Sequence, residues 1–201
     1  MDDSTKTGEK RGNKGNKKTD LRVIRTKRNI RAAFVELAKK KPVSKITVTE
    51  LAEKAMINKG TFYLHYRDIY ELYLDVIQER LEERLNLIED YSRFFDDPEG
   101  FIKEFFSYFG KGKMEEEFPI LSETLGLRLP AMITESLKQR LYDTGRVEKN
   151  PENDMKLECA LICFFMMGGR YQKKHPKAMG DTVSTVIHAL FQKADQKSGE
   201  A

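Results

Sequence analysis

Tryptophan, long apolar runs and clusters of cysteine are missing from this sequence. The chain has 201 residues, no Trp and two Cys. No apolar run approaches the roughly 20 residues needed to cross a bilayer, so the sequence predicts no membrane-spanning helix. The first twenty residues lack the apolar centre of a secretory signal. We therefore expect a cytoplasmic protein without membrane attachment.

The two cysteines and the lack of catalytic motifs argue against a disulfide, a metal site and an enzyme. Cys159 and Cys163 lie four residues apart, on one face of an expected helix. Adjacent helical turns offer poor disulfide geometry, and no His or further Cys completes a zinc pattern. We expect buried thiols, no metal and no cofactor. No phosphate-binding loop or nucleophile–base motif is present either, which disfavours an enzyme.

Charge divides the chain into two unequal regions. Residues 1–67 hold 18 Lys and Arg against 7 Asp and Glu, a net charge of +11. Residues 68–201 hold 18 against 25, a net charge of −7. Residues 1–20 are rich in Gly, Asn, Lys and Thr, which predicts a disordered basic arm. The charge pattern indicates a nucleic-acid-binding module at the N-terminal end.

Residues 46–63 predict two short helices joined by a tight turn. Thr47 is a suitable N-cap for the first helix, and Glu50 three residues later matches the capping-box pattern. Asn58 is a suitable cap for a second helix that opens on Lys-Gly-Thr. This arrangement predicts a helix-turn-helix, whose second helix enters the DNA major groove. Apolar spacing alone fits an ordinary core hairpin equally well, but the coincident basic charge favours the DNA-binding interpretation.

Three segments resemble the DNA-binding domain of the TetR family of transcriptional regulators. RNIRAAFVELAKKK resembles the family's first helix, ITVTELAEKA its second, and GTFYLHYRD its third with the start of the fourth. The specific resemblance covers about residues 22–75. It implies an all-α fold of about nine helices. A three-helix helix-turn-helix domain would span residues 21–67, followed by a helical ligand-binding and dimerisation domain over 68–201.

The sequence departs from the family pattern at two positions. Met56 stands in the turn where the family most often has glycine, which predicts strain because a side chain is costly in a left-handed conformation. Ile69 stands where a lysine often begins the fourth helix, which predicts one phosphate contact fewer.

The start of the second helix supplies the candidate base-reading residues. Lys59 can donate to guanine, and the hydroxyl or methyl of Thr61 can meet a base or phosphate. Gly60 lets the backbone approach DNA closely. By the resemblance, Tyr63 and His65 contact phosphates, with packing inside the domain as the alternative. Helix-start and basic positions complete the predicted DNA-binding set: Thr47, Asn58, Lys27, Lys45 and Arg67.

Apolar spacing and capping residues predict the remaining organisation. Seven residues are expected in the core of the N-terminal domain or as tightly packed supports: Phe34, Leu37, Leu51, Ile57, Phe62, Leu64 and Tyr66. Asp68, Asp97, Asn150 and Asp181 are the expected N-caps or starts of later helices. Those helices are expected near residues 69–88, 98–109, 114–123, 131–144, 151–174 and 181–194. No segment indicates a strand or an internal repeat.

The last two long helices form the expected dimerisation surface. Residues 159–169 are apolar almost all round, more than one buried face requires. Two copies related by a two-fold axis would read an inverted repeat. The resemblance implies a four-helix bundle, and a helix fully buried in a monomer is the alternative. The candidate dimer residues are Cys163, Met167, Gly168, Val186 and Leu190.

Aromatic and methionine side chains concentrate between residues 94 and 132. They can line an apolar ligand pocket, and a plain hydrophobic core explains them equally well. In the resembling family, an effector bound here shifts the helix that starts after Asp68 and changes the spacing of the DNA-binding domains. The candidate ligand-binding residues are Phe101, Phe105, Phe109, Phe118 and Met132.

These features predict a ligand-responsive, sequence-specific transcriptional regulator. The leading interpretation is a repressor that binds a double-stranded, inverted-repeat operator as a homodimer and responds to a small apolar effector. A partner-binding coactivator on the same fold is the first alternative. An enzyme on a helical scaffold is the second.

Overall fold

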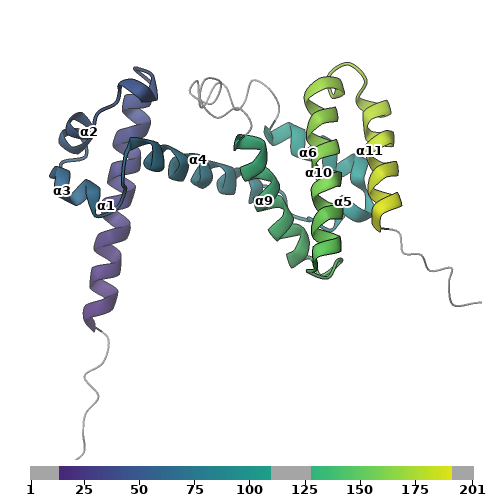
Figure 1. Ribbon diagram of the computed structural model, residues 1–201, viewed down its shortest axis with the longest axis horizontal. Helices are drawn as coiled ribbons and strands as arrows, with labels where there is room; N and C mark the ends of the chain where they lie inside the picture. Colours follow the sequence, from purple (N-terminus) through teal and green to yellow (C-terminus); the bar gives the residue numbers. More distant parts are fainter. Residues whose placement is uncertain (1–13, 110–127, 192–201) are drawn as a thin grey trace, which may run out of the picture. The chain divides into compact units, whose positions relative to one another are not determined.

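The protein is all-helical, as the sequence predicts. The computed structural model describes residues 14–109 and 128–191 (Figure 1). Across these residues it has nine α-helices, one 3₁₀ helix and no strand. The chain divides into two compact units, Met1–Tyr73 and Leu74–Ala201, and α4 contributes residues to both. Each unit is described on its own below.

The N-terminal unit is built on one long helix. Phe34, Leu37, Phe62 and Tyr66 are buried, which confirms their predicted core positions. The Phe34 ring lies 6.2 Å from the Tyr73 ring at the start of α4. The elements of this unit are α1 (Lys14–Ala38), η1 (Val43–Lys45), α2 (Val48–Lys54), α3 (Lys59–Tyr63) and the first residues of α4 (Ile69–Leu85).

Helix α1 corrects the predicted extent of the disordered arm. The helix begins at Lys14, so residues 14–20 are helical rather than part of an arm that ends at residue 20. No proline interrupts this stretch. Once a helix has formed, each added residue loses conformational entropy but gains one backbone hydrogen bond, so the helix can extend over these residues. The sequence suggested disorder here because the segment is rich in Gly, Asn, Lys and Thr. Residues 1–13 lie outside the described part of the chain.

The C-terminal unit packs its helices around an aromatic core. Figure 1 shows α10 and α11 side by side, joined by a short connection, and α9 along the other side of α10. Phe101 and Phe105 are buried with Phe164, whose ring lies 4.9 Å from that of Phe105. The helices wholly in this unit are α5 (Arg93–Asp96), α6 (Pro98–Phe109), α9 (Arg128–Asp143), α10 (Pro151–Tyr171) and α11 (Pro176–Phe191).

Three predicted helix starts are confirmed by their cap hydrogen bonds. The Asp68 carboxylate accepts from the Glu71 N–H at 2.8 Å, at the start of α4. The Asp97 carboxylate accepts from the Gly100 N–H at 3.0 Å, at the start of α6. The Asn150 side-chain oxygen accepts from the Asn153 N–H at 2.8 Å, at the start of α10. Each side chain satisfies an amide that the first helical turn leaves without an intrahelical partner.

Other helix boundaries differ from the prediction because prolines lie inside the first helical turn. Helix α9 begins at Arg128, so Pro130 is its third residue, and α11 begins at Pro176 rather than after Asp181. Proline is tolerated there because the first amides of a helix make no intrahelical bond.

Helix α4 ends at Leu85, before the expected Ile88, which is nevertheless buried. The expected helix at 114–123 lies outside the described residues.

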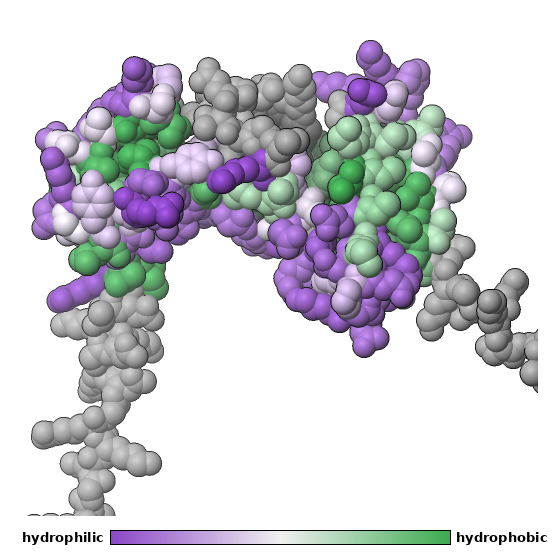
Figure 2. Space-filling view, in the orientation of Figure 1, coloured by the Kyte–Doolittle hydropathy of each residue, from purple (hydrophilic) through white to green (hydrophobic). Residues whose placement is uncertain are grey.

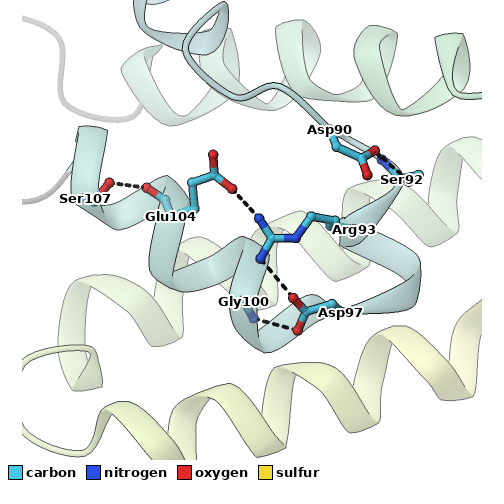
Figure 3. A network of polar contacts seen from close by, with 7 residues as sticks. All are labelled: Asp90, Ser92, Arg93, Asp97, Gly100, Glu104 and Ser107. Carbon is cyan, nitrogen blue, oxygen red and sulfur yellow. Dashed lines mark hydrogen bonds and ion pairs between the residues drawn. The ribbon is translucent and has the colours of Figure 1, made fainter.

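A polar network fixes the short helix α5 against α6 (Figure 3). Arg93 donates to Glu104 at 2.6 Å and to Asp97 at 2.8 Å. The hydrogen bond from Arg93, followed by the one from Gly100, lowers the pKa of Asp97. The same Asp97 carboxylate therefore caps α6 and holds the guanidinium of α5. The four-residue α5 was not predicted, because a single turn has no detectable periodicity.

Candidate nucleic-acid interface

Side-chain caps define both short helices of the helix-turn-helix. The Thr47 hydroxyl accepts from the Glu50 N–H at 3.3 Å, and the Asn58 side-chain oxygen accepts from the Thr61 N–H at 2.6 Å. Both predicted caps are therefore confirmed. The Glu50 carboxylate pairs with Lys41, on the segment between α1 and η1. These contacts place the start of α3 at a defined position after the turn.

The turn between α2 and α3 depends on the backbone conformation of Met56. Its φ is 54°, the left-handed region, and its side chain is 92% exposed. The Ile57 N–H donates across the turn to the Ala52 carbonyl at 2.9 Å. The structure therefore places a non-glycine residue in left-handed backbone here, a conformation that is unfavourable for a residue with a Cβ.

Helix α3 has one buried side and one exposed side. Phe62 is 0% exposed and Tyr66, just after the helix, is 3% exposed. Lys59, Gly60 and Tyr63 are exposed. The helix is thus anchored by its aromatic side, while Lys59, Gly60 and Tyr63 lie on the solvent side.

Leu64 contradicts its predicted position. The sequence placed it with the core or its close supports, but its side chain is 81% exposed. The reason is geometric: residues 62 and 66 are four apart and share the buried side, whereas residue 64 lies half a turn away from both.

Thr61 and Asn58 are engaged with one another. The Thr61 hydroxyl donates to the Asn58 side-chain oxygen at 2.9 Å, in addition to the amide bond of the cap. This contact orients the Thr61 side chain and assigns the Asn58 oxygen to capping. A contact from either residue to DNA stays a prediction, for which the Thr61 methyl and the Asn58 amide NH₂ are the remaining groups.

Tyr63 and His65 lie close together at the end of α3 and differ in environment. Tyr63 is exposed, and its ring meets the Phe62 ring edge-on at 5.4 Å. His65 is half-buried, and burial, then the charge of Lys27, lowers its pKa. The Lys27 ammonium lies 5.4 Å from the centre of the Tyr66 ring. Lys27 therefore supports the packing of this segment, and its expected phosphate contact stays a prediction.

The remaining basic candidates lie at the edges of the domain. The Arg67 side chain is 82% exposed and its Nε lies 3.3 Å from the Asp68 carboxylate. Lys45 is exposed at the end of η1. An exposed pair such as Arg67 with Asp68 adds little stability, so its guanidinium can exchange the carboxylate for a phosphate at small cost.

Four of the five predicted dimer residues are partly exposed, and the fifth, Gly168, is buried. Cys163 and Met167 on α10, and Val186 and Leu190 on α11, are partly exposed. Figure 2 shows apolar surface over the faces of α10 and α11. The most exposed large apolar side chains of α10 follow a helical spacing that the sequence analysis did not select: Met155, Ile162 and Met166.

Gly168 packs against α6 inside the chain, and its role between copies stays a prediction. A Cβ atom built on Gly168 would lie 1.8 Å from Cζ of Phe106, on α6. The glycine is buried, so it allows the Phe106 ring to pack directly on the α10 backbone. The close approach that the structure shows at Gly168 is to α6 of the same chain.

The predicted ligand-binding aromatics lie in the core. The rings of Phe105 and Phe109 are stacked with centroids 4.4 Å apart, and both residues are buried with Phe101. Met132 lines an open pocket of about 570 Å³, together with Gln78 and Arg140. Phe118 lies outside the described residues. The burial of the three phenylalanines is what a plain core requires, so the effector site stays a prediction.

Polar ties between α4 and α9 were not visible in the sequence. Glu82 accepts from Arg140 at 2.6 Å and from the Ser136 hydroxyl at 2.8 Å. Burial raises the pKa of Glu82, but the hydrogen bonds from Arg140, Ser136 and Gln78 outweigh it and the net pKa is lowered. The partners are more than 50 positions apart in the chain, so no local sequence pattern predicts these hydrogen bonds.

The cysteines depart in part from their predicted burial. Cys159 is exposed and Cys163 is half-buried, and burial raises the pKa of the Cys163 thiol. Within the described residues, no group of three or more His, Cys, Asp or Glu side chains is arranged to hold a metal ion. Among the helices that the structure describes, none is both long and apolar enough to cross a membrane.

Comparison with known proteins identifies the helix-turn-helix. Residues 30–76 match the model of the bacterial regulatory proteins of the tetR family. A Bacillus subtilis (strain 168) protein named as an uncharacterized HTH-type transcriptional regulator, YxbF, is 37% identical over 68 residues. That alignment covers 33% of this chain and 18% of the relative's length, and no solved structure matches. The family match lies on the capped helix-turn-helix and the start of α4, so this part of the chain is similar to the helix-turn-helix domain of the TetR-family regulators.

Proposed function

We propose that the protein is a repressor that binds an inverted-repeat DNA operator as a homodimer and releases it when a small organic effector binds. The observation that carries the proposal is the exposed side of α3. Lys59, Gly60 and Tyr63 face solvent there, while Phe62 anchors the opposite side. A capped recognition helix with a basic, sterically open face suits entry into the major groove.

The predicted DNA-binding residues have distinct expected roles in this proposal. Lys59 reads a base edge, because its ammonium can donate to guanine O6 and N7. Thr61 offers its methyl group, since its hydroxyl is engaged by Asn58. Tyr63, His65 and Arg67 contact phosphates and so set the position of the helix on the duplex. Lys45 and the amides at the start of α2 beside Thr47 add further phosphate contacts.

Dimerisation follows from the limited reach of one recognition helix and from the apolar surface of α10. Met155, Ile162 and Met166 are exposed at positions that share one side of that helix. Large exposed apolar surface marks interaction sites in soluble proteins. We assign this stripe, with Val186 and Leu190 of α11, to the contact between two copies.

The pocket lined by Met132 supports a ligand-responsive C-terminal unit. Its wall includes Gln78 and Glu82 of α4, and α4 continues into the N-terminal unit. A ligand with different affinity for two positions of α4 would shift their populations. This route makes effector-driven DNA release the expected behaviour.

The proposal is tested by selecting DNA from a randomised duplex library with the purified full-length chain. We expect enrichment of an inverted repeat, bound at least 10³-fold more tightly than random duplex, roughly the lower end for specific DNA-binding proteins. Failure to enrich any sequence would contradict the proposal and favour the coactivator alternative, in which the same domain binds a protein.

A further inference from the structure

Leu64 is a large apolar side chain that the fold leaves in solvent. It follows directly after α3 and is 81% exposed, whereas its neighbours Phe62 and Tyr66 are buried. Its position is well defined, because the backbone at Leu64 is helical and its N–H donates to the Gly60 carbonyl at 3.1 Å. The exposure is therefore a consequence of regular helix geometry.

The hydrogen bond from Leu64 to Gly60 also shows that these two residues lie on the same side of α3. A residue four positions after Gly60 lies one helical turn further on the same side. Because Gly60 carries no side chain, the surface there consists of bare backbone followed by the Leu64 side chain. Lys59 and Tyr63 form the adjacent pair at the same spacing, and both are exposed. The solvent side of α3 thus combines one cation, one open backbone position, one phenol and one apolar group.

Base edges in the major groove offer an apolar side chain a single type of partner. Adenine, guanine and cytosine present hydrogen-bonding groups, whereas thymine also presents its C5-methyl group. A leucine that meets a polar base edge contributes no favourable binding free energy. A leucine that packs against a thymine methyl group removes apolar surface from water, which favours binding. The leucine therefore carries sequence information that Lys59 does not.

We propose that Leu64 reads a thymine in each operator half-site through the C5-methyl group, with Gly60 allowing the backbone to approach closely enough. The inference rests on the proposed function, since it requires α3 to enter the major groove. A protein partner is the less suitable occupant, because exposed Lys59 and Arg67 accompany this leucine and fit a polyanion.

The test replaces single thymines by deoxyuridine, which lacks only the C5-methyl group. The probes are the duplex selected by the full-length chain and copies that carry one substitution in one half-site. For the wild type, we expect one substitution to weaken binding about fourfold, the equivalent of about 0.8 kcal/mol for one buried CH₂ group. Leu64→Ala should bind the unsubstituted duplex more weakly and become insensitive to that substitution. Leu64→Met should retain the sensitivity.

The outcomes separate this inference from the proposed function. If the wild type selects and binds a specific duplex but every deoxyuridine substitution is silent, the inference is wrong and the function stands. Equal sensitivity in wild type and Leu64→Ala would also overturn the inference, because another residue would then contact the methyl group. If no specific duplex is selected, both fail together. A thermal melt of Leu64→Ala should match the wild type, since the side chain is exposed in the free protein.

Discussion

The backbone conformation of Met56 is expected to lower the free energy of unfolding of the helix-turn-helix. Its positive φ is unfavourable for any side chain, and its side chain makes little contact because it is exposed. Met56→Gly should therefore raise the free energy of unfolding by about 0.5–1 kcal/mol, after allowing for the entropy of glycine in the unfolded chain. Urea denaturation measures the change.

Met56→Ala is the matched control, because it shortens the side chain and keeps the Cβ. We expect no stabilisation from it. A gain equal to that of glycine would show that the side chain, and not the backbone angle, is the source of the strain.

His65 predicts a pH dependence of DNA binding. Burial and the charge of Lys27 lower its pKa in the free protein, which favours the neutral ring. A bound phosphate would favour the protonated ring, so binding takes up a proton and the pKa rises in the complex. Affinity should therefore increase as the pH falls through the raised pKa of the complex, and level off below the lowered pKa of the free protein.

His65→Gln is expected to remove most of this increase while leaving the affinity in mildly alkaline buffer nearly unchanged. Fluorescence anisotropy with the selected duplex, from mildly alkaline to mildly acidic pH, is the measurement. An unchanged pH profile in His65→Gln would show that the imidazole does not face a phosphate.

At the scale of single residues, the sequence was most informative where the chemistry is local. Thr47, Asn58 and Asp68 cap the helices that they were predicted to cap, because a cap depends on amides only two or three positions away. Leu64 was misplaced because hydrophobicity alone does not say which side of a five-residue helix is buried. Cys159 was misplaced because its apolar neighbours in the sequence do not say which side of α10 is buried.

At the scale of elements, packing of α6 on α10 depends on Gly168. Gly168→Ala places a Cβ against the Phe106 ring, and overpacking of this kind costs about 1–3 kcal/mol. The overlap is severe, so the cost should exceed the gain of up to about 1 kcal/mol in helix propensity and lower the free energy of unfolding. Thermal or urea denaturation checks the sign.

Gly180 offers a matched control on α11. A Cβ there would meet the Glu99 side chain at 2.9 Å, and that exposed side chain can rotate away. Gly180→Ala should be neutral or stabilising. Combining Gly168→Ala with Phe106→Leu should recover part of the stability, and a strictly additive double variant would contradict the proposed contact.

Helices with strong local signals were predictable, and those defined by tertiary contacts were not. The starts of α4, α6 and α10 follow from Asp or Asn caps that can be recognised in the sequence. The four-residue α5 depends on Arg93 reaching Glu104 of the next helix, a contact that no periodicity encodes. The burial of Phe101 and Phe105 was consistent with either pocket or core, because both use the same residue types.

At the scale of the whole molecule, dimerisation is the first property to test. Ile162→Glu with Met166→Glu places charges on the exposed stripe of α10 and should give a monomer at micromolar concentration by sedimentation velocity. The double variant should also bind the selected duplex far more weakly, because each copy then reads one half-site alone. Leu87→Glu, at a comparably exposed apolar residue outside the stripe, should remain dimeric. A monomeric wild type would contradict the dimer.

The chain-wide charge distribution was fully predictable from the sequence, since it requires only counting. The basic N-terminal region coincides with the unit that carries the helix-turn-helix. The effector could not be predicted, because the recognisable family pattern stops near residue 76 and the helices beyond it are defined by long-range packing.

The central claim is that the exposed start of α3 reads DNA sequence, and one titration series tests it most directly. Wild type, Lys59→Ala with Thr61→Ala, and Arg67→Ala are titrated with the selected duplex and a scrambled duplex at several salt concentrations. Removing each base-reading side chain should cost about 1–3 kcal/mol of discrimination, so that binding to the selected duplex weakens more than binding to the scrambled duplex. Arg67→Ala should weaken binding to both duplexes and reduce the salt slope by about one for each phosphate that the arginine neutralises. Equal weakening on both duplexes for the Lys59 and Thr61 variant would contradict the claim.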